Sequence, residues 1–388
     1  MPDRNEQPVV VVGAGPVGLF AALSLLARGV RPIVIEKRRE PRPGSRSIGV
    51  HPPSLELLDA LGLGGAFVAR GVRVRRGRAF GASGEIGMVS FASCPGAHPY
   101  VLTIAQEDTE SILAEALETR APGALQRGVE LVSITPRDHA VDLTVRDHDG
   151  TTRTIEAAAV IGCDGRRSAT RSASSIASLG LTYEGAYAMV DVPDTTRFGD
   201  DAAIFLGAGG LVESFPLSRR WRRWVIRRDA EGQGDVTIEE IADTVERRTG
   251  HRLPRNEARA PSAFRAERAL ATELARGRVA LAGDAAHVVS PIGGQGMNLG
   301  WRGAATLADA LSGALARGDD PTIALAADAT VRARAARAAT RRAELNMWLG
   351  RPTARAADRD RVVTALLLQP VASVLARAFT MRGLEAGV

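Results

Sequence analysis

One stretch of the chain combines a buried strand, a carboxylate and a glycine-rich turn: Arg278-Val-Ala-Leu-Ala-Gly-Asp284-Ala-Ala-His287-Val-Val-Ser-Pro291-Ile-Gly-Gly-Gln-Gly296-Met-Asn298. The pattern predicts a strand at 279–282, a loop, and a helix that continues to about Leu315. A carboxylate at the end of a strand accepts hydrogen bonds from hydroxyl groups, and glycines let a flat ring approach the backbone. The N-terminus of the helix stabilises negative charge. This stretch therefore predicts a site for a large hydroxyl- and phosphate-bearing cofactor, with an ordinary glycine-rich loop as the alternative.

The N-terminus predicts a second part of the same site. An apolar run, Val9–Val12, is followed by Gly13-Ala-Gly15-Pro16-Val-Gly18, an alanine-rich helix to Arg28, and a strand that ends in Glu36. This is a βαβ unit with G-x-G-x-x-G at its first turn. The glycines serve the tight turn, the approach of a pyrophosphate and helix–strand packing, and Glu36 suits ribose hydroxyls. The basic residues after Glu36, beginning with Lys37, suggest a 2′-phosphate instead, but the acid favours a dinucleotide that lacks one.

The rest of the chain predicts two further sheets. Strands at 129–134, 141–146 and 152–156 have the spacing of a β-meander, and the buried strand 157–161 is followed by Asp164. Strands at 72–91 and 183–228 are expected to form one antiparallel sheet. The chain from about 328 onward is expected to be helical.

Composition excludes several classes of function. Hydrophobic residues make up 45% of the 388 residues, and only two cysteines occur, so we expect a globular, cytoplasmic protein without disulfides. The uncharged run 9–27 is interrupted by glycines and Pro16, which argues against stable membrane insertion. Aromatic residues are only 4% and do not alternate with basic runs, so we expect no nucleic-acid partner. The six histidines show no ligand spacing, so no metal site is expected.

Taken together, G-x-G-x-x-G with Glu36, the Asp164-Gly165 segment, and Gly283-Asp284 with Pro291-x-Gly-Gly-Gln-Gly resemble the single-component FAD-dependent aromatic hydroxylases. These are the para-hydroxybenzoate hydroxylase-like, or group A, flavoprotein monooxygenases. The resemblance covers nearly the whole chain. It implies cofactor contacts at Gly13, Gly15, Pro16, Gly18, Glu36, Lys37, Arg46, Gln106, Asp164, Asp284, Pro291, Gly294, Gly296, Met297 and Asn298.

The roles implied by this resemblance differ along the chain. The first glycines would hold the FAD pyrophosphate, and Glu36 the adenosine ribose. Asp164 is implied in both FAD and NAD(P)H binding, Asp284 in binding the ribityl or pyrophosphate part, and residues 296–298 would face the pyrimidine edge of the flavin. The chain departs from the family at Leu299-Gly-Trp-Arg-Gly303, where an acid is often found.

The resemblance also implies an α/β fold with a Rossmann-like FAD-binding domain. That domain would comprise residues 1–75, 100–180 and 265–345. An antiparallel β-sheet domain for the substrate would comprise 76–99 and 181–264, and a C-terminal helical segment 346–388.

The implied function is that of an FAD-dependent monooxygenase. NADPH or NADH would reduce the flavin, O2 would form a C4a-hydroperoxyflavin, and one oxygen atom would pass to a small aromatic or phenolic substrate, such as a polycyclic intermediate of antibiotic biosynthesis. Candidates for a general base are His51, Tyr187 and His287, each of which also fits a structural role. An epoxidase, a Baeyer–Villiger oxidase, an isoprenoid double-bond reductase and a non-catalytic flavin-binding module remain alternatives. The sequence leaves the substrate, the nicotinamide and the oligomeric state open.

Overall fold

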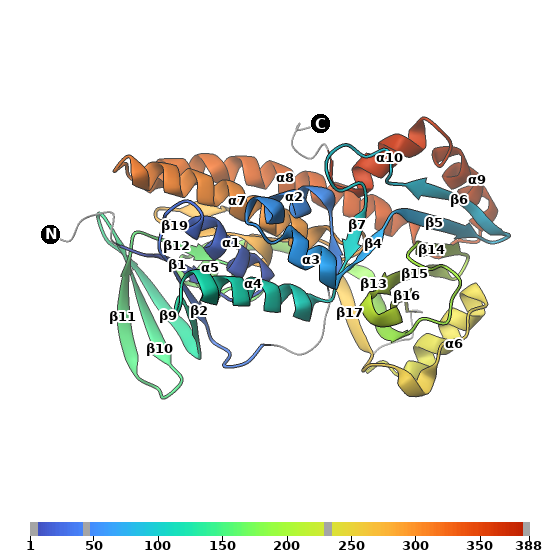
Figure 1. Ribbon diagram of the computed structural model, residues 1–388, viewed down its shortest axis with the longest axis horizontal. Coiled ribbons are helices and arrows are strands. Elements are labelled where there is room, and N and C mark those ends of the chain that lie inside the picture. Colours follow the sequence, from blue (N-terminus) through green and yellow to red (C-terminus); the bar gives the residue numbers. More distant parts are fainter. Residues whose placement is uncertain (1–6, 42–46, 229–234, 383–388) are drawn as a thin grey trace.

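A six-stranded sheet organises one half of the computed structural model, which describes residues 7–41, 47–228 and 235–382 (Figure 1). Its strand order is β18-β19-β12-β1-β2-β8, and all neighbours are parallel except β18 and β19. The strands are β18 (Ala275–Arg276), β19 (Val279–Leu281), β12 (Ala159–Gly162), β1 (Val9–Val12), β2 (Pro32–Glu36) and β8 (Leu125–Arg127). Strand β1 thus lies inside the sheet, which confirms the predicted βαβ unit.

The four valines of β1 are buried because both faces of this sheet are covered. Val9 and Val11 pack against helices α1 (Pro16–Leu26), α4 (Gln106–Arg120) and α7 (Gln295–Ala316). Val10 and Val12 pack against the meander of β9 (Val129–Pro136), β10 (Val141–Asp147) and β11 (Thr152–Ala157). A strand buried on both faces needs a continuous apolar run rather than alternation, as this sequence has.

Helix α7 is held against the start of α1 by the side chain of Trp301. The Trp301 ring stacks on Phe20, with centroids 5.7 Å apart, and meets Phe67 edge-on at 6.0 Å. Its Nε1 donates a hydrogen bond to the Pro16 carbonyl at 2.9 Å. Because Trp301 is fully buried, this bond satisfies a carbonyl beside the glycine loop and aligns two helix N-termini.

The second half of the molecule is built on an eight-stranded sheet of order β20-β17-β13-β16-β15-β14-β5-β6. Its strands are β20 (His287–Val288), β17 (Ser262–Ala271), β13 (Ser178–Pro193), β16 (Trp221–Arg227), β15 (Gly210–Leu217), β14 (Ala202–Gly207), β5 (Arg76–Gly81) and β6 (Gly84–Ser90). Helix α6 (Ile238–Thr249) covers one face. The predicted sheet is therefore present, and it also contains β17, which crosses the expected domain boundary at 264/265, and β20, which lies in the range 265–345.

Two details of the predicted sheet are wrong. Strands β14 and β5 pair in parallel, so the sheet is not wholly antiparallel. Residues 72–74 form β4 (Val72–Val74), which joins β3 (Gly49–Val50) and β7 (Val101–Thr103) in a separate three-stranded sheet. The arginines at 73, 75, 76 and 78 have a two-residue spacing that shifts by one position between Arg75 and Arg76. The chain changes sheets at that point, but a shift of one position also fits a bulge within a single strand.

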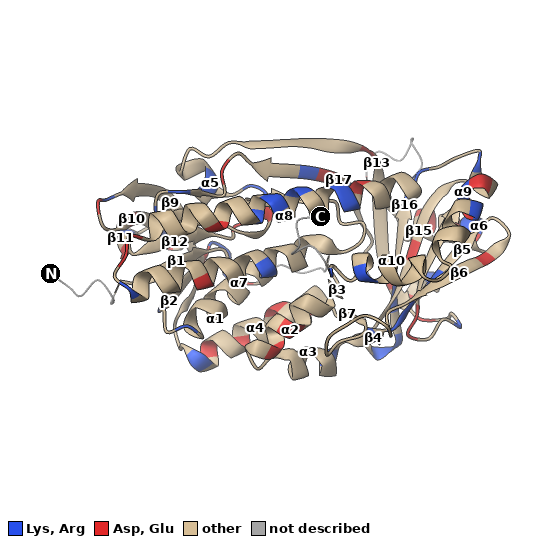
Figure 2. Ribbon diagram, turned by 90° about the horizontal axis from the view of Figure 1, so that it is seen from above, with Lys and Arg blue, Asp and Glu red and all other residues tan. Residues whose placement is uncertain are grey.

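Helices complete the remaining surfaces of the two halves. The short helices are α2 (Pro52–Ala60), α3 (Gly64–Arg70) and α5 (Ala169–Ala173). Helix α8 (Pro321–Leu349) packs along α7, and it is followed by α9 (Ala356–Leu366) and α10 (Val371–Phe379), which adjoin β6. Figure 2 shows α8 running from the six-stranded sheet toward these last helices, with basic and acidic residues interspersed along both halves.

Within the described residues, no single helix is long and apolar enough to cross a membrane. Helices α9 and α10 meet at a bend of 95° and satisfy length and composition criteria for a span only when taken together. Cys94 and Cys163 are both free thiols.

Candidate functional site

The loop between β1 and α1 contains three glycines in three different surroundings. A Cβ atom on Gly13 would lie 2.6 Å from the Cys163 carbonyl oxygen, and Gly13 has a φ of +101°. A Cβ on Gly18 would lie 1.9 Å from the Gly13 carbonyl oxygen. Gly15 caps α1, and a Cβ there would meet no atom within 4 Å. Gly13 and Gly18 are thus required by the packing of the protein, whereas Gly15 leaves open space at a helix N-terminus, where phosphate groups bind.

Glu36 lies against this loop at the end of β2. Its Oε2 accepts a hydrogen bond from Ala14 N at 3.0 Å, and its Oε1 accepts one from Arg38 N at 3.1 Å. The side chain is buried, and the next residue, Lys37, is exposed. The carboxylate therefore fixes the loop and stands where the ribose of a dinucleotide is bound in βαβ units.

Four parallel strands, β1, β2, β12 and β19, end at the same edge of the six-stranded sheet. The glycine loop, Glu36, Asp164 and Asp284 follow these ends. The Asp164 carboxylate accepts hydrogen bonds from Ser168 Oγ at 2.5 Å and from Thr170 N at 2.9 Å, so it organises the start of α5. Asp284 is exposed between two buried residues. Ligands of open α/β sheets bind at the edge where the parallel strands end. Of the three acids at this edge, Asp284 is the most exposed and therefore the most accessible to a ligand.

The turn before α7 brings the glycine-rich stretch to the same edge. Gly293 and Gly294 have φ values of +94° and +65°, a conformation that glycine adopts without strain, and Gly294 caps α7. Pro291 is exposed at the start of the turn. Gly296 lies in the first helical turn, and a Cβ there would meet no atom within 4 Å. A flat ring could therefore approach the backbone at Gly296 and at the N-terminus of α7.

Asn298 ties this turn to the segment between β3 and α2. It is fully buried. Its Oδ1 accepts a hydrogen bond from His51 N at 2.8 Å, and its Nδ2 donates to the carbonyls of Gly49 at 2.8 Å and Gly294 at 2.9 Å. The neighbouring Met297 is half-buried against the core of the six-stranded sheet. The amide of Asn298 thus holds the shape of the turn, and contact with a cofactor in this region would come from backbone groups.

His51 lies beside the glycine turn. A Cβ on Gly294 would be 3.6 Å from His51 Nε2, so the imidazole lies against the backbone of the turn. Burial lowers the pKa of His51 to about 4, although interaction with the backbone of Gly293 and Gly294 partly offsets this effect. The imidazole is therefore neutral near pH 7 and lies next to the turn.

The other two candidate bases lie elsewhere. His287 is on β20 and is paired with Leu270. Burial, and then the charge of Arg332, lower the pKa of His287 to about 4. Tyr187 is fully buried on β13, its ring stacked on Phe264 at 5.5 Å, and burial raises the pKa of its hydroxyl. No hydrogen bond or ring contact joins His51, Tyr187 and His287 among the described residues.

Gln106 contacts the chain at Ser47, the first residue described after the gap at 42–46. Gln106 is the first residue of α4. Its Oε1 accepts a hydrogen bond from Ser47 N at 3.2 Å, and its Nε2 donates to Glu110 at 2.8 Å. Arg46 lies outside the described residues.

One buried acid, Glu213, was missed by the sequence analysis. It lies on β15 between Ile204 of β14 and Val225 of β16, and it is only 8% exposed. Burial raises the pKa of this carboxyl to about 7. The sequence does contain a clue to this acid. Glu213 is two residues from both Leu211 and Phe215, so in a strand it shares one face with two apolar side chains.

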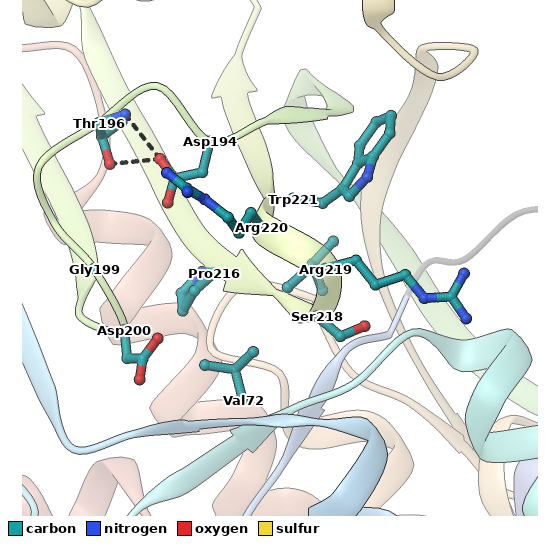
Figure 3. Close-up of a pocket in the computed structure, with 11 residues that line it drawn as sticks. Val72, Asp194, Thr196, Gly199, Asp200, Pro216, Ser218, Arg219, Arg220 and Trp221 are labelled. Carbon is teal, nitrogen blue, oxygen red and sulfur yellow. Dashed lines mark hydrogen bonds between the residues drawn. The ribbon is translucent and has the colours of Figure 1, made fainter.

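A separate cavity of about 320 Å³ lies at the turn between β15 and β16 (Figure 3). Arg219 and Arg220 both have a left-handed backbone there, with φ values of 60° and 59°. Asp194 lies in the same cavity and accepts hydrogen bonds from Thr196 N and Oγ1. None of the predicted cofactor residues lines this cavity. Among the described residues, no group of three or more His, Cys, Asp or Glu side chains is placed to hold a metal ion.

Comparison with known proteins matches this chain to an FAD binding domain and to monooxygenases. A family model described as an FAD binding domain matches residues 6–343. The chain is 33% identical over 318 residues to 6-methylpretetramide 4-monooxygenase of Streptomyces rimosus, covering 79% of this chain and 56% of that protein. It is 32% identical over 310 residues to pentachlorophenol 4-monooxygenase of Sphingobium chlorophenolicum, covering 78% and 57%. The chain therefore spans little more than half the length of these relatives.

A solved structure matches over nearly the whole length of both chains. The crystal structure of p-nitrophenol 4-monooxygenase from Pseudomonas putida DLL-E4 superimposes with a TM-score of 0.86 at 25% sequence identity, covering 98% of each chain. The two-sheet arrangement with C-terminal helices is thus also found in a protein of similar length.

Substitutions at two glycines are expected to separate folding from cofactor binding. Gly18→Ala places a methyl group against the Gly13 carbonyl and should destabilise the fold by about 3 kcal/mol. Gly15→Val fills open space and should leave stability within about 0.5 kcal/mol, yet raise the FAD dissociation constant at least about tenfold. Urea unfolding and FAD titration measure the two effects. Wild-type FAD affinity in Gly15→Val would contradict the assignment.

Glu213 is expected to make stability depend on pH. The folded pKa of about 7 lies above the ordinary value of 4.5, so the folded state favours the protonated carboxyl. Its contribution to stability is therefore present below about pH 4.5 and is lost as pH rises to about 7. Relative to wild type, Glu213→Gln should gain on the order of 2–3 kcal/mol in unfolding free energy between pH 4.5 and pH 8. Denaturant unfolding at both values tests this; a pH-independent difference would refute it.

Proposed function

This chain belongs to the FAD binding domain family of FAD-dependent aromatic monooxygenases, and on that premise we propose that it uses NADPH or NADH and O2 to hydroxylate small aromatic, above all phenolic, substrates. The observation that carries the proposal is the common edge of four parallel strands. Three features lie at that edge: the open helix N-terminus at Gly15, the carboxylate of Glu36, and the turn before α7.

The residues at this edge fit the parts of FAD. The N-terminus of α1 at Gly15 would hold the pyrophosphate, because its unpaired N–H groups and helix dipole favour anions. Glu36 would accept hydrogen bonds from the adenosine ribose, and Asp284 would bind the ribityl chain or the pyrophosphate. The open backbone at Gly294–Gly296 would lie along the pyrimidine edge of the ring.

When bound, FAD supplies the redox chemistry, taking a hydride from the nicotinamide and activating O2. The first turn of α7 would stabilise negative charge on a ring held beside it, because the N-terminus of a helix carries partial positive charge. Asn298 holds this turn in place through His51 N and the Gly49 carbonyl. His51 remains neutral beneath the turn and adds a hydrogen-bonding nitrogen without adding charge.

The names of relatives indicate the range of substrates to test. They include proteins named for pentachlorophenol, for 6-methylpretetramide and for rifampicin, so we propose phenols and polycyclic natural products, with a role in antibiotic biosynthesis or in the modification of antibiotics. We also propose the division into an FAD-binding part and a substrate-binding sheet, and a cytoplasmic location. The eight-stranded sheet supports that division because it is continuous and has its own apolar cluster under α6.

Oxygen uptake by FAD-loaded protein tests the proposal. Addition of NADPH or NADH with a phenol should consume O2 and yield a product heavier by one oxygen atom, as measured with an oxygen electrode and mass spectrometry. Gly15→Val serves as a matched control that should fold, hold less flavin than wild type at the same FAD concentration, and consume O2 correspondingly more slowly. Reduction of an alkene without O2 uptake would indicate a reductase. A lactone or epoxide product would indicate one of the other oxygenases, and flavin binding without NAD(P)H oxidation a binding module.

A further inference from the structure

The face of the eight-stranded sheet opposite α6 carries a polar cluster in an apolar setting. Strand register places Tyr187 and Met189 of β13, Val225 of β16, and Leu211 and Glu213 of β15 on this face, which we call the inner face. Most of these side chains belong to one buried apolar cluster that also contains Ile292, from the turn before α7, and Met347 of α8. The inner face therefore adjoins the part of the chain proposed to contact the flavin.

Glu213 is the unsatisfied acid of this face. Glu213 is 8% exposed, and no hydrogen bond or ion pair joins its carboxylate to another described residue. Neither of its oxygens is among the described side-chain atoms that are fully closed off from solvent without a partner, so the carboxylate keeps some access for a ligand. Burying a carboxylate without partners costs several kcal/mol in general, so such groups are normally paired. The Tyr187 hydroxyl, two strands away, is also buried on this face. Burial and the charge of Glu213 raise the pKa of this hydroxyl, whereas the nearby Arg227 guanidinium lowers it. The inner face thus holds a carboxylate without a described partner and a buried hydroxyl.

Among the described residues, the charged groups on the surrounding elements make no hydrogen bond or ion pair with Glu213. Arg223 of β16 pairs with Asp191 of β13, with Nε 2.7 Å from Oδ1. On β17, Arg268 pairs with Glu344 of α8 at 2.7 Å. In α9, Asp360 accepts a hydrogen bond from Ala82 N, and Arg359 donates to the carbonyls of Leu206 and Gly207. Arg227 and Arg351 act on Tyr187, whereas burial alone accounts for the raised pKa of Glu213.

We propose that Glu213 is a substrate-positioning residue, which accepts a hydrogen bond from the hydroxyl group of an aromatic substrate bound against the inner face. This inference rests on the proposed function and adds the residue that recognises the substrate. An aromatic ring suits the apolar surroundings, and its hydroxyl supplies the donor that the carboxylate lacks. Tyr187 lies on the next strand but one and offers a second polar contact for the same hydroxyl.

This role makes binding sensitive to pH in a definite direction. Only the ionised carboxylate acts purely as an acceptor, and hydrogen bonds to charged groups are the stronger ones. Affinity for a phenol that stays protonated should therefore rise as pH increases through about 7, where Glu213 loses its proton. A ligand without a hydroxyl group should show no such dependence.

A matched pair of ligands tests the inference on FAD-loaded enzyme. 2-Naphthol and 2-methoxynaphthalene differ only in the hydroxyl hydrogen, and calorimetry at pH 5.5 and 8.5 without a nicotinamide measures their binding. Wild-type enzyme should bind 2-naphthol about tenfold more tightly at pH 8.5 than at pH 5.5. Glu213→Gln should weaken 2-naphthol binding at pH 8.5 by at least about tenfold, abolish its pH dependence, and leave the ether unchanged.

Glu85→Gln is the control, because Glu85 lies on β6 of the same sheet but is exposed and paired with Arg78. It should bind both ligands as wild type does. Unchanged naphthol binding in Glu213→Gln would overturn the inference. Equal loss of both ligands, or failure of wild-type enzyme to bind either, would do the same. Because binding is measured without turnover, these outcomes are independent of the oxygen-uptake test, and thermal melting confirms that each variant is folded.

Discussion

The structure depends on the close approach of two backbone segments at the end of β1. Gly18 of α1 packs so tightly on the Gly13 carbonyl that no side chain fits between them, and Gly13 in turn packs on Cys163 at the end of β12. This contact seats α1 over the sheet with its N-terminus at the edge where the parallel strands end. The open position at Gly15 and the buried Glu36 both follow from that placement.

Helix α7 links this edge to the second sheet. Trp301 anchors it to the start of α1, while Asn298 fixes its first turn to the chain beside His51. The turn that precedes α7 carries Ile292, which packs into the same apolar cluster as the inner face of the eight-stranded sheet. One helix N-terminus is therefore positioned by both halves of the molecule. Under the proposed function, this arrangement would hold FAD and an aromatic substrate in a fixed relation to each other.

Features set by local patterns were predictable from the sequence. The valine run, the glycine spacing and Glu36 identify the βαβ unit, because each reflects packing within about thirty residues. Features set by long-range pairing were not. The parallel pairing of β14 with β5 joins segments far apart in the chain, and nothing in either strand encodes it. The roles of Asp164 and Asn298 in holding loops depend likewise on partners that only the fold supplies, and Glu213 becomes notable only once its neighbours are known.

A crystal structure of the protein loaded with FAD would test the central claim most directly. We expect pyrophosphate density over Gly15 at the N-terminus of α1, the adenosine ribose within hydrogen-bond distance of Glu36, and the ring edge along the backbone of Gly294–Gly296. Flavin density at the cavity beside Arg219, or anywhere away from the ends of β1, β2 and β19, would contradict it.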